Sequence, residues 1–551
     1  MPPSFELYDD DAWDRGEAIW LAWKKKLFDR DVYRQVAATV RKHRLGTPVE
    51  VCAPKKGAFN VHYRVKFADG GSAIIRFPIP GYFRFAEEKL RAGVAVMRYV
   101  AEHTSIPVPF VFYLGTAEES PGKLGPFIVM EYIEHHWDLC DVLVTPGTPI
   151  EVKPVLNPNI DEALLDKVYG QMADILLQLA SCTFDKIGCP QAMLPSDDDA
   201  GGDSPFDITS RPFTFNLAQL GEVGGCPPWA LPDATTTYAT ASDYYTALAD
   251  MHLLQLTYQR NGAVESADDA RKKYVARHLF RRWAAERRRR RPCRRHLITA
   301  DDPHAPAARD AGPFPLWCDD LRPSNVLLDK DCNVVGVVDW EFSYAAPADF
   351  ACAPPWWLLL TMPEEWKAGL DDWVPTYAPR LEVFLRALEK REEAAAAAAA
   401  AVAVQTGHDD HAAKDKDKDK NTTTPLSVRM RRSWEAGEFW VSYAARKTWA
   451  FDGIYWRFLD ERFWGPGPTA SPSPFLDRLA LLPADDAAAM EAFVERKLRE
   501  KEERTLVDWY ALEAADTTHG GSATMKRGAP GPSVIGSNTI ASTDEPVRSS
   551  P

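Results

Sequence analysis

Three side chains in the middle of the chain have the types and the spacing that phosphoryl transfer requires. Asp320 and Asn325 are five residues apart, and Asp339 follows them after two short apolar runs. Phosphoryl transfer from a nucleotide needs a carboxylate that orients the acceptor hydroxyl and accepts its proton, and it needs oxygen ligands for Mg²⁺. We therefore interpret Asp320 as the base, and Asn325 and Asp339 as the metal ligands.

These three residues also have a purely structural interpretation. Asp320 and Asn325 could be turn and capping residues of a hairpin loop, and Asp339 could be a carboxylate at the end of a strand. The spacing of Asp339 from Asn325 and the order of the surrounding elements favour the catalytic interpretation.

The part of the chain before these residues predicts a small β-rich lobe. Apolar residues alternate as in strands, a Gly-Gly turn follows, and apolar residues then recur at helical spacing. The expected elements are, in order, strands at residues 49–52, 60–67 and 73–77, a helix with the apolar stripe Leu90, Val94, Met97 and Ala101, and a strand at residues 127–133.

The pattern then becomes helical. One apolar stripe covers residues 165–179, and another covers residues 245–254 with Ser242 as its expected N-cap. Residues 326–328 and 334–338 are short β-type runs that predict a hairpin. A β-rich lobe, a connecting strand and a helical lobe that contains a small hairpin follow one another along the chain.

Composition limits the class of protein. The 551 residues exceed one ordinary domain, and 65 Lys and Arg against 79 Asp and Glu give a net charge of −14. This acidity argues against a nucleic-acid binder and suits a cationic or metal-bridged small substrate. The sequence has no apolar run of membrane-spanning length, its acidic first 15 residues predict no secretory signal, and its nine cysteines are scattered. We expect a cytoplasmic protein with no membrane partner.

Low-complexity composition suggests where the folded lobes end. Residues 392–420 run from polyalanine into alternating Lys and Asp, which is typical of disorder, although the alanines could also extend the preceding helix. The expected segments are an N-terminal helical extension (1–48), a nucleotide-binding N-lobe (49–133), a C-lobe with the catalytic loop (134–391), a low-complexity insertion (392–425), a C-terminal helical part of the C-lobe (426–513) and a disordered tail (514–551).

The segment Trp317-Cys318-Asp319-Asp320-Leu321-Arg322-Pro323-Ser324-Asn325, followed by Val338-Asp339-Trp340, resembles a family signature. It is similar to the H-G-D-x-x-x-x-N and I-D-W motifs of the aminoglycoside phosphotransferase and choline kinase-like group, most closely its large fungal branch. The resemblance runs from about residue 49 to residue 465. It implies an α+β, protein kinase-like fold with a small β-rich N-lobe, a large helical C-lobe, and ATP and Mg²⁺ in the cleft.

The resemblance also implies roles for residues of the N-lobe. Arg76 stands on the strand where the family places its phosphate-binding Lys, and Gly57 and Asn60 lie in the position of the phosphate loop. Glu131 and Ile133 belong to the connection between the lobes, where backbone groups would contact adenine.

Three residues depart from the family pattern. Cys318 stands where the family usually has His, and Arg76 replaces a Lys. Gly93 stands where the family has the Glu that pairs with the strand cation, and Glu88 is the expected substitute. Arg322 could provide a further contact to phosphate.

Two functions follow from these observations. The first is an ATP- and Mg²⁺-dependent kinase that phosphorylates a hydroxyl of a small molecule, with Asp320 and Arg322 as catalytic residues. The second, motivated by the three departures, is a catalytically impaired pseudokinase that acts as a nucleotide-binding or protein-interaction module.

Overall fold

The protein is described by a computed structural model. It describes residues 8–149, 151–192, 206–289, 310–405, 424–467, 473–504 and 507. The predicted tail, residues 514–551, and most of the predicted insertion, residues 406–423, lie outside the described residues.

An antiparallel sheet forms the core of the N-lobe. Its strands pair in the order β1-β3-β4-β6-β5, and β2 pairs with the N-terminal end of β3. The strands are β1 (Pro48–Val51), β2 (Lys55–Lys56), β3 (Asn60–Phe67), β4 (Ser72–Pro78), β5 (Val111–Gly115) and β6 (Phe127–Glu131). The predicted hairpin of β3 and β4 is confirmed, with Tyr63 opposite Ile75. The strand β5 was not predicted.

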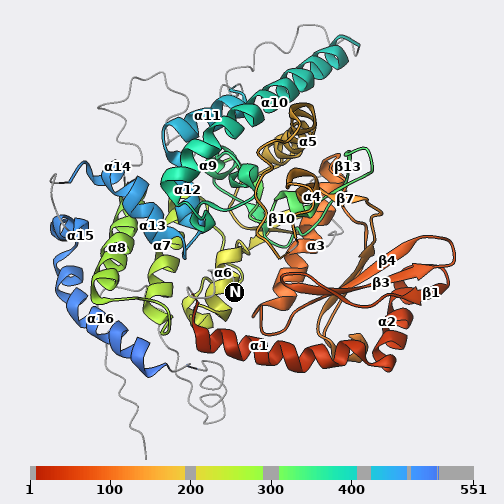
Figure 1. Cartoon of the computed structure of the whole chain (residues 1–551), viewed down its shortest axis with the longest axis horizontal. Coiled ribbons are helices and arrows are strands. Elements are labelled where there is room, and N and C mark those ends of the chain that lie inside the picture. Colours follow the sequence, from red (N-terminus) through yellow and green to blue (C-terminus); the bar gives the residue numbers. More distant parts are fainter. Residues whose placement is uncertain are drawn as a thin grey trace, which may run out of the picture.

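Helices cover both faces of this sheet. On one face, α1 (Asp10–Lys24) and α2 (Arg30–His43) bury Trp20, Trp23 and Val36 against alternate residues of β3, β4 and β6. On the other face, α3 (Ala86–His103) packs its apolar stripe into the core that the N-lobe shares with the C-lobe. Figure 1 shows α1 along the lower edge of the molecule, beneath the sheet.

Helix α1 also contacts the C-lobe. Its N-cap Asp9 donates its backbone N–H to the carbonyl of Val223, and its carboxylate accepts a hydrogen bond from the backbone N–H of Arg260. Near the other end of the helix, the indole N–H of Trp23 donates to the carbonyl of Leu124 in the N-lobe. The helix therefore connects the two lobes along one side.

The C-lobe is built mainly from helices, which Figure 1 shows to the left of and above the N-lobe. They are α4 (Leu139–Leu143), α5 (Glu162–Ser181), α6 (Phe215–Glu222), α7 (Ala241–Tyr258), α8 (Ala267–Arg289), α9 (Ala348–Ala351), α10 (Leu370–Gln405), α11 (Leu426–Glu435), α12 (Glu438–Arg446), α13 (Phe451–Ile454), α14 (Asp460–Trp464), α15 (Pro474–Arg478) and α16 (Ala484–Glu503). Of the described tryptophans after residue 350, Trp357, Trp373 and Trp440 are buried among these helices, and the others are partly buried.

Short strands in the C-lobe hold the segments that carry the candidate site. They form the ladders β13-β12-β7, β14-β11-β8 and β10-β9. Their bounds are β7 (Trp137–Asp138), β8 (Thr183–Phe184), β9 (Cys189–Ala192), β10 (Phe206–Ser210), β11 (Phe314–Cys318), β12 (Val326–Leu328), β13 (Val334–Val337) and β14 (Ser343–Ala345). The predicted hairpin of β12 and β13 is confirmed.

The structure corrects the predicted N-cap of α7 and shows how far α10 extends into the alanine tract. Ser242 is not the N-cap of α7, because Thr240 caps it by accepting from the backbone N–H of Asp243, while Ser242 donates its hydroxyl to Asp310. Helix α10 continues through the alanine tract to Gln405. Among the described residues, no helix is both long and apolar enough to cross a membrane.

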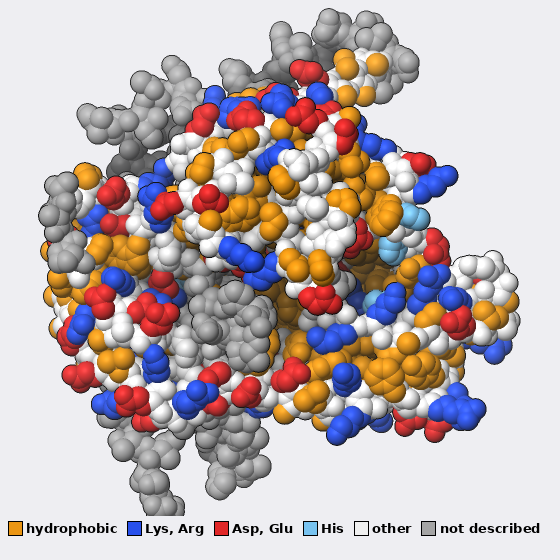
Figure 2. Space-filling model, viewed as in Figure 1, with side chains coloured by type: hydrophobic (Ala, Val, Ile, Leu, Met, Phe, Trp, Pro, Cys, Tyr) orange, Lys and Arg blue, Asp and Glu red, His pale blue; other side chains and the backbone are white. Residues whose placement is uncertain are grey.

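The predicted α+β, two-lobed, protein kinase-like architecture is confirmed. The β-rich N-lobe precedes the helical C-lobe in the chain, as the pattern of the sequence indicates. Figure 2 shows that the surface is hollowed where the two lobes meet.

Candidate active site

The loop between β11 and β12 brings Asp320 and Asn325 together. The chain leaves β11 at Cys318 and re-enters a strand at Val326, after a 3₁₀ turn over Pro323–Asn325. The side-chain amide of Asn325 donates from Nδ2 to the backbone oxygen of Asp320 at 2.8 Å and to its Oδ2 at 3.1 Å. Spacing of five residues therefore closes a tight loop whose two polar side chains face each other.

The carboxylate of Asp320 is largely buried. About 20% of its side chain is exposed, and Arg322 Nε lies 3.0 Å from its Oδ1. Burial raises the pKa of Asp320 to about 6, because the ionised form loses hydration, and this outweighs the attraction of Arg322. The nearby carboxylate of Asp339 raises this pKa further. A carboxylate with such a pKa is suited to accept a proton near neutral pH.

Asp339 follows β13 in an unusual backbone conformation. Its φ is +64°, in the left-handed region that residues other than glycine rarely adopt. The preceding residue, Val338, donates its backbone N–H to the carbonyl of Asn325 at 2.9 Å, which ties this turn to the loop of Asp320. Asp339 remains 36% exposed and accepts a hydrogen bond from Nη1 of Arg76. Strained residues held by their surroundings are common at functional sites.

Arg76 on β4 is bound by two carboxylates. It is 7% exposed, and its second guanidinium nitrogen, Nη2, donates to Oε2 of Glu341. Burial opposes a charged guanidinium, but the attraction of Glu341 and Asp339 raises the pKa of Arg76, so the residue stays protonated. The cation of the N-lobe strand thus lies beside the expected metal ligand.

Glu341 is the centre of a buried polar cluster that also contains Lys89 and Asn60. Its Oε1 accepts from Asn60 Nδ2 at 2.7 Å and lies 3.0 Å from Lys89 Nζ. Lys89 is fully buried, and its Nζ also donates to Oδ1 of Asn60 at 3.0 Å. Burial alone would raise the pKa of Glu341, but Arg76 and Lys89 lower it to about 2.

The other predicted residues of the nucleotide site lie in the turn before β3 and at the connection between the lobes. Gly57 lies in the exposed turn between β2 and β3, where its N–H donates to the carbonyl of Asn60. Glu131 ends β6, and its carboxylate accepts from the backbone N–H of Phe110. The carbonyl of Ile133 lies 2.8 Å from the His135 ring.

Glu88 is not brought to Arg76. Its two carboxylate oxygens bind Arg211 at 2.8 Å and 2.7 Å. Glu88 therefore does not pair with Arg76 in place of the missing Glu at position 93. Successive residues of a helix point about 100° apart, so Glu88 faces a different part of the C-lobe from its neighbour Lys89. Gly93 lies one turn beyond Lys89, against the backbone of Glu341: a Cβ added to it would lie 3.3 Å from the Cα of Glu341.

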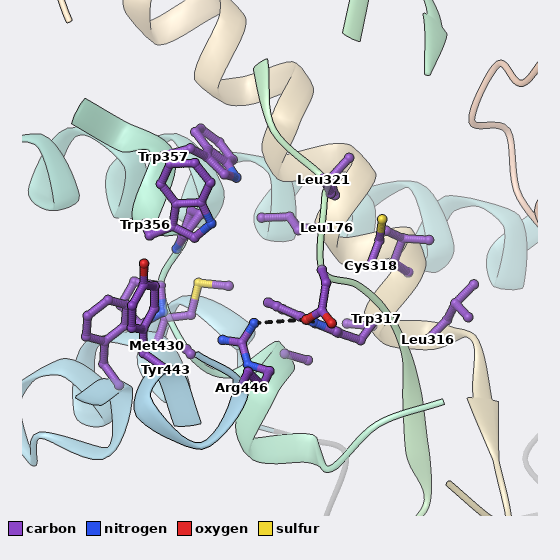
Figure 3. Close-up of a pocket in the computed structure, with 18 residues that line it drawn as sticks. Leu176, Leu316, Trp317, Cys318, Leu321, Trp356, Trp357, Met430, Tyr443 and Arg446 are labelled. Carbon is purple, nitrogen blue, oxygen red and sulfur yellow. Dashed lines mark hydrogen bonds and ion pairs between the residues drawn. The ribbon is translucent and has the colours of Figure 1, made fainter. Parts of the chain in front are cut away.

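The side chains of Cys318 and Asp319, which precede Asp320, contact other residues of the C-lobe. Burial raises the pKa of Cys318 to about 12, so its thiol stays protonated. Asp319 accepts from the indole of Trp317 at 2.9 Å, and Arg446 Nη1 lies 3.3 Å from the same oxygen. A small, mainly apolar cavity of about 40 Å³ lies beside this loop and is lined in part by Cys318, Asp319 and Arg446. Figure 3 shows Arg446 among the lining residues, with its ion pair dashed. The contacts of Cys318, Asp319 and Arg446 therefore hold the loop of Asp320 against the C-lobe.

Sequence reasoning missed the roles of Glu341 and Lys89. Glu341 is two residues after Asp339, so it lies within the motif that was recognised, and Lys89 lies beside Glu88 on the predicted helix. The available signal was a charged residue that flanks the apolar stripe, since Lys89 directly precedes Leu90 and lies four residues before Gly93.

Comparison with known proteins identifies the family. The model of the phosphotransferase enzyme family matches residues 50–372, which is more than half of the chain. The chain therefore belongs to the phosphotransferase enzyme family, a family of small-molecule phosphotransferases, and the predicted resemblance is confirmed.

Solved structures are similar over most of their length at low identity. A macrolide 2'-phosphotransferase from Brachybacterium faecium is 12% identical, with a TM-score of 0.32, and the match covers 79% of this chain and 99% of that one. An ethanolamine kinase from Plasmodium vivax is 11% identical, with a TM-score of 0.32 and coverages of 84% and 83%. An amicoumacin kinase, in complex with AMP-PNP and Ca²⁺, is 11% identical, with a TM-score of 0.33 and coverages of 89% and 98%. No curated protein matches the chain.

Proposed function

We propose that the protein is an ATP- and Mg²⁺-dependent kinase that phosphorylates a hydroxyl of a small molecule. The observation that carries this proposal is the convergence of Asp320, Asn325 and Asp339 beside Arg76. The backbone bond from Val338 to Asn325 and the side-chain bonds from Asn325 to Asp320 hold the three groups in one place. The location we propose is the cytoplasm, as the scattered cysteines of the sequence predict.

The donor set fits Mg²⁺, which prefers oxygen ligands. Asn325 directs Nδ2 to Asp320, so its amide oxygen is the atom that would face a metal, and the carboxylate of Asp339 is partly exposed beside it. Mg²⁺ held by Asn325 and Asp339 would neutralise charge on the phosphates of the nucleotide.

Each step of the transfer has a candidate residue. The acceptor oxygen forms a bond to the γ-phosphorus of ATP while the bond to ADP breaks, and the acceptor proton passes to the carboxylate of Asp320. Arg76 would contact the phosphates, and Arg322, whose Nε lies 3.0 Å from Asp320, would contact the transferred group. Positioning and charge stabilisation account for most of the catalysis in such a reaction.

The backbone of the N-lobe would hold the nucleotide. The turn of Gly57 and Asn60, between β2 and β3, would contact the phosphates, and the segment from Glu131 to Ile133 would contact adenine. Arg76 now binds Asp339, so it must turn from that carboxylate to the phosphates when the metal and the nucleotide enter.

The same ion pair favours a second candidate function, a pseudokinase that binds a partner or a nucleotide without transfer. If Arg76 keeps Asp339, the metal loses one of its ligands. The presence of Glu341 as a second carboxylate for Arg76 supports the enzyme instead, because Arg76 retains a partner when Asp339 is released.

An unbiased screen of hydroxyl metabolites for ATP-dependent phosphorylation tests the proposal. The full chain is incubated with ATP and Mg²⁺, and Asp320→Asn is run in parallel as the control. We expect a phosphorylated product that the variant does not form. The panel includes amines and amino sugars, because the net charge of −14 suits a cationic acceptor. Wild type and variant that are equally inert, while both bind nucleotide, would favour the pseudokinase.

A further inference from the structure

Three side chains from different elements of the N-lobe meet at one carboxylate. Asn60 belongs to β3, Arg76 to β4 and Lys89 to α3, and all three bind Glu341. Glu341 itself lies after β13, in the segment that carries Asp339. We propose that Glu341 is the positioning residue that holds Arg76 at the phosphates and fixes the N-lobe to the catalytic segment; this rests on the proposed function.

The hydrogen bonds use both oxygens of Glu341. Oε2 accepts from Arg76, while Oε1 accepts from Asn60 at 2.7 Å and lies 3.0 Å from the ammonium of Lys89. The carboxylate is only 3% exposed. A buried charge is stable only when such partners replace its hydration. The N-lobe side chains therefore hold Glu341 in position, and Glu341 holds these side chains in position.

Two basic and two acidic side chains meet around Glu341. Arg76 and Lys89 are the basic ones, and Glu341 and Asp339 are the acidic ones. When Asp339 is taken by a metal ion, Glu341 is the carboxylate that still orients the guanidinium of Arg76. The arrangement keeps the cation in place during the exchange of partners that catalysis requires.

Protein kinases orient their strand cation with a Glu on the helix that follows it. In this chain the same helix, α3, carries a cation, Lys89, and the anion comes from the other lobe. Gly93 makes this possible because it has no side chain, and the backbone of Glu341 approaches within 3.3 Å of the position that a Cβ would take. The carboxylate that binds the strand cation therefore comes from the catalytic segment, so the pair links the two lobes, whereas the pair of protein kinases lies within one lobe.

Replacing Glu341 and placing a carboxylate on helix α3 instead tests whether Glu341 positions Arg76. Glu341→Gln and Glu341→Ala remove the anion, and the double variant Gly93→Glu/Glu341→Ala returns a carboxylate to the same place from α3, next to Lys89. Binding of Mg²⁺·AMP-PNP is measured by calorimetry with the full chain. We expect each single variant to bind about tenfold or more weakly and the double variant to recover most of the loss, because a charge-assisted contact to Arg76 is restored.

A second readout follows the link between the lobes. Hydrogen exchange of the α3 backbone amides should accelerate in Glu341→Gln while the amides of the C-lobe helix α7 keep their wild-type rates. The double variant Lys89→Met/Glu341→Gln removes a cation together with the anion, so it is expected to fold even where the single variant is too unstable, and it should show the same faster exchange and weak binding.

Two controls separate positioning from general stability. Glu102→Gln makes the same change at an exposed site on the last turn of α3. Asp460→Asn breaks the buried ion pair with Arg478 in the C-lobe and lowers stability at a distance. Both should bind Mg²⁺·AMP-PNP as the wild type does.

The outcomes are distinct. If Glu341→Gln loses stability but binds the nucleotide normally, or if Gly93→Glu fails to restore binding in a folded protein, Glu341 is not the positioning residue and the inference is overturned. If the wild type does not bind the nucleotide, the proposed function itself fails, and this inference fails with it.

Discussion

Lys89 Nζ lies 3.0 Å from Oε1 of Glu341, although the two residues are about 250 positions apart in the chain and belong to different lobes. The same carboxylate binds Arg76 on the neighbouring strand. The cation that we assign to the phosphates is therefore oriented by the segment that supplies the expected metal ligand, Asp339. The lobes are connected at the point where chemistry is proposed to occur.

Replacing the proposed base should separate transfer from binding. We expect Asp320→Asn to lower the rate of transfer by about 100-fold or more, because the amide cannot accept the acceptor proton. Nucleotide binding should change little, since Asn at position 320 can still accept from Nδ2 of Asn325. Rates are measured with the acceptor found in the metabolite screen.

Asp319→Asn is the matched control for this variant. Asp319 is adjacent to Asp320 but binds Trp317 and Arg446 behind the loop. Its loss should lower the midpoint of unfolding and leave a greater fraction of activity than Asp320→Asn. Equal activity of the wild type and Asp320→Asn would exclude Asp320 as the base.

The pKa of Asp320 predicts a pH dependence of stability. Burial raises this pKa from 3.8 to about 6, so the folded state binds more protons than the unfolded state between these values. The contribution of Asp320 to stability is therefore lost as the pH rises from about 4 to about 6, by up to about 3 kcal/mol. Urea unfolding at a series of pH values measures this.

The comparison is again with Asp320→Asn, which has no titrating group at this position. Its free energy of unfolding should approach or exceed that of the wild type as the pH rises, and the difference should level off above about pH 7. Parallel curves for the two proteins would show that Asp320 titrates normally. In the wild type, kcat/KM should rise through an apparent pKa near 6, because only ionised Asp320 accepts a proton.

The packing of α1 on the N-lobe predicts a destabilising glycine substitution. A Cβ on Gly16 would lie 2.4 Å from the carbonyl oxygen of Gly81, which is a backbone atom that cannot simply rotate away. We expect Gly16→Ala to lower the free energy of unfolding by about 1–3 kcal/mol. Denaturant unfolding measures the change.

Gly453→Ala is the control for the effect of an added methyl group in a helix. Gly453 lies in α13, and a Cβ there would meet nothing within 4 Å. This variant should be neutral or more stable by up to about 1 kcal/mol, because alanine favours the helix. If Gly16→Ala is as stable as Gly453→Ala, α1 does not pack closely against the turn of Gly81.

Sequence reasoning reached the candidate site because its main residues are close together in the chain. Asp320 and Asn325 lie in one loop, and Asp339 is separated from them by a single hairpin whose alternation is clear. The strands β3 and β4 were predicted for the same reason, since a short turn joins them.

The rest of the site depends on contacts between distant segments. Glu88 and Lys89 are neighbours with similar helical context, and only the packed structure shows that Lys89 turns to Glu341 while Glu88 turns to Arg211. Sequence spacing cannot decide such a pairing, because helix α3 can rotate about its axis until the C-lobe fixes it.

Local sequence patterns also did not identify the N-cap of α7, because two candidate capping residues lie close together. Thr240 and Ser242 are both good capping residues two positions apart, and Ser242, three residues before the apolar stripe, is the N-cap expected from the sequence. Asp310, 68 residues away, accepts from the hydroxyl and the backbone N–H of Ser242, which leaves capping to Thr240. The long polar helix α8 has a weak apolar stripe and was not predicted.

The central claim is that Asp320, Asn325 and Asp339 form one magnesium–nucleotide site. Calorimetric titration of the full chain with AMP-PNP, with and without Mg²⁺, tests it most directly, using Asp339→Asn because asparagine tolerates the φ of +64° at this position. We predict saturable binding that requires Mg²⁺ in the wild type and falls by about tenfold or more in Asp339→Asn. Binding that is absent from the wild type, or that is the same in the variant and independent of Mg²⁺, would contradict the account.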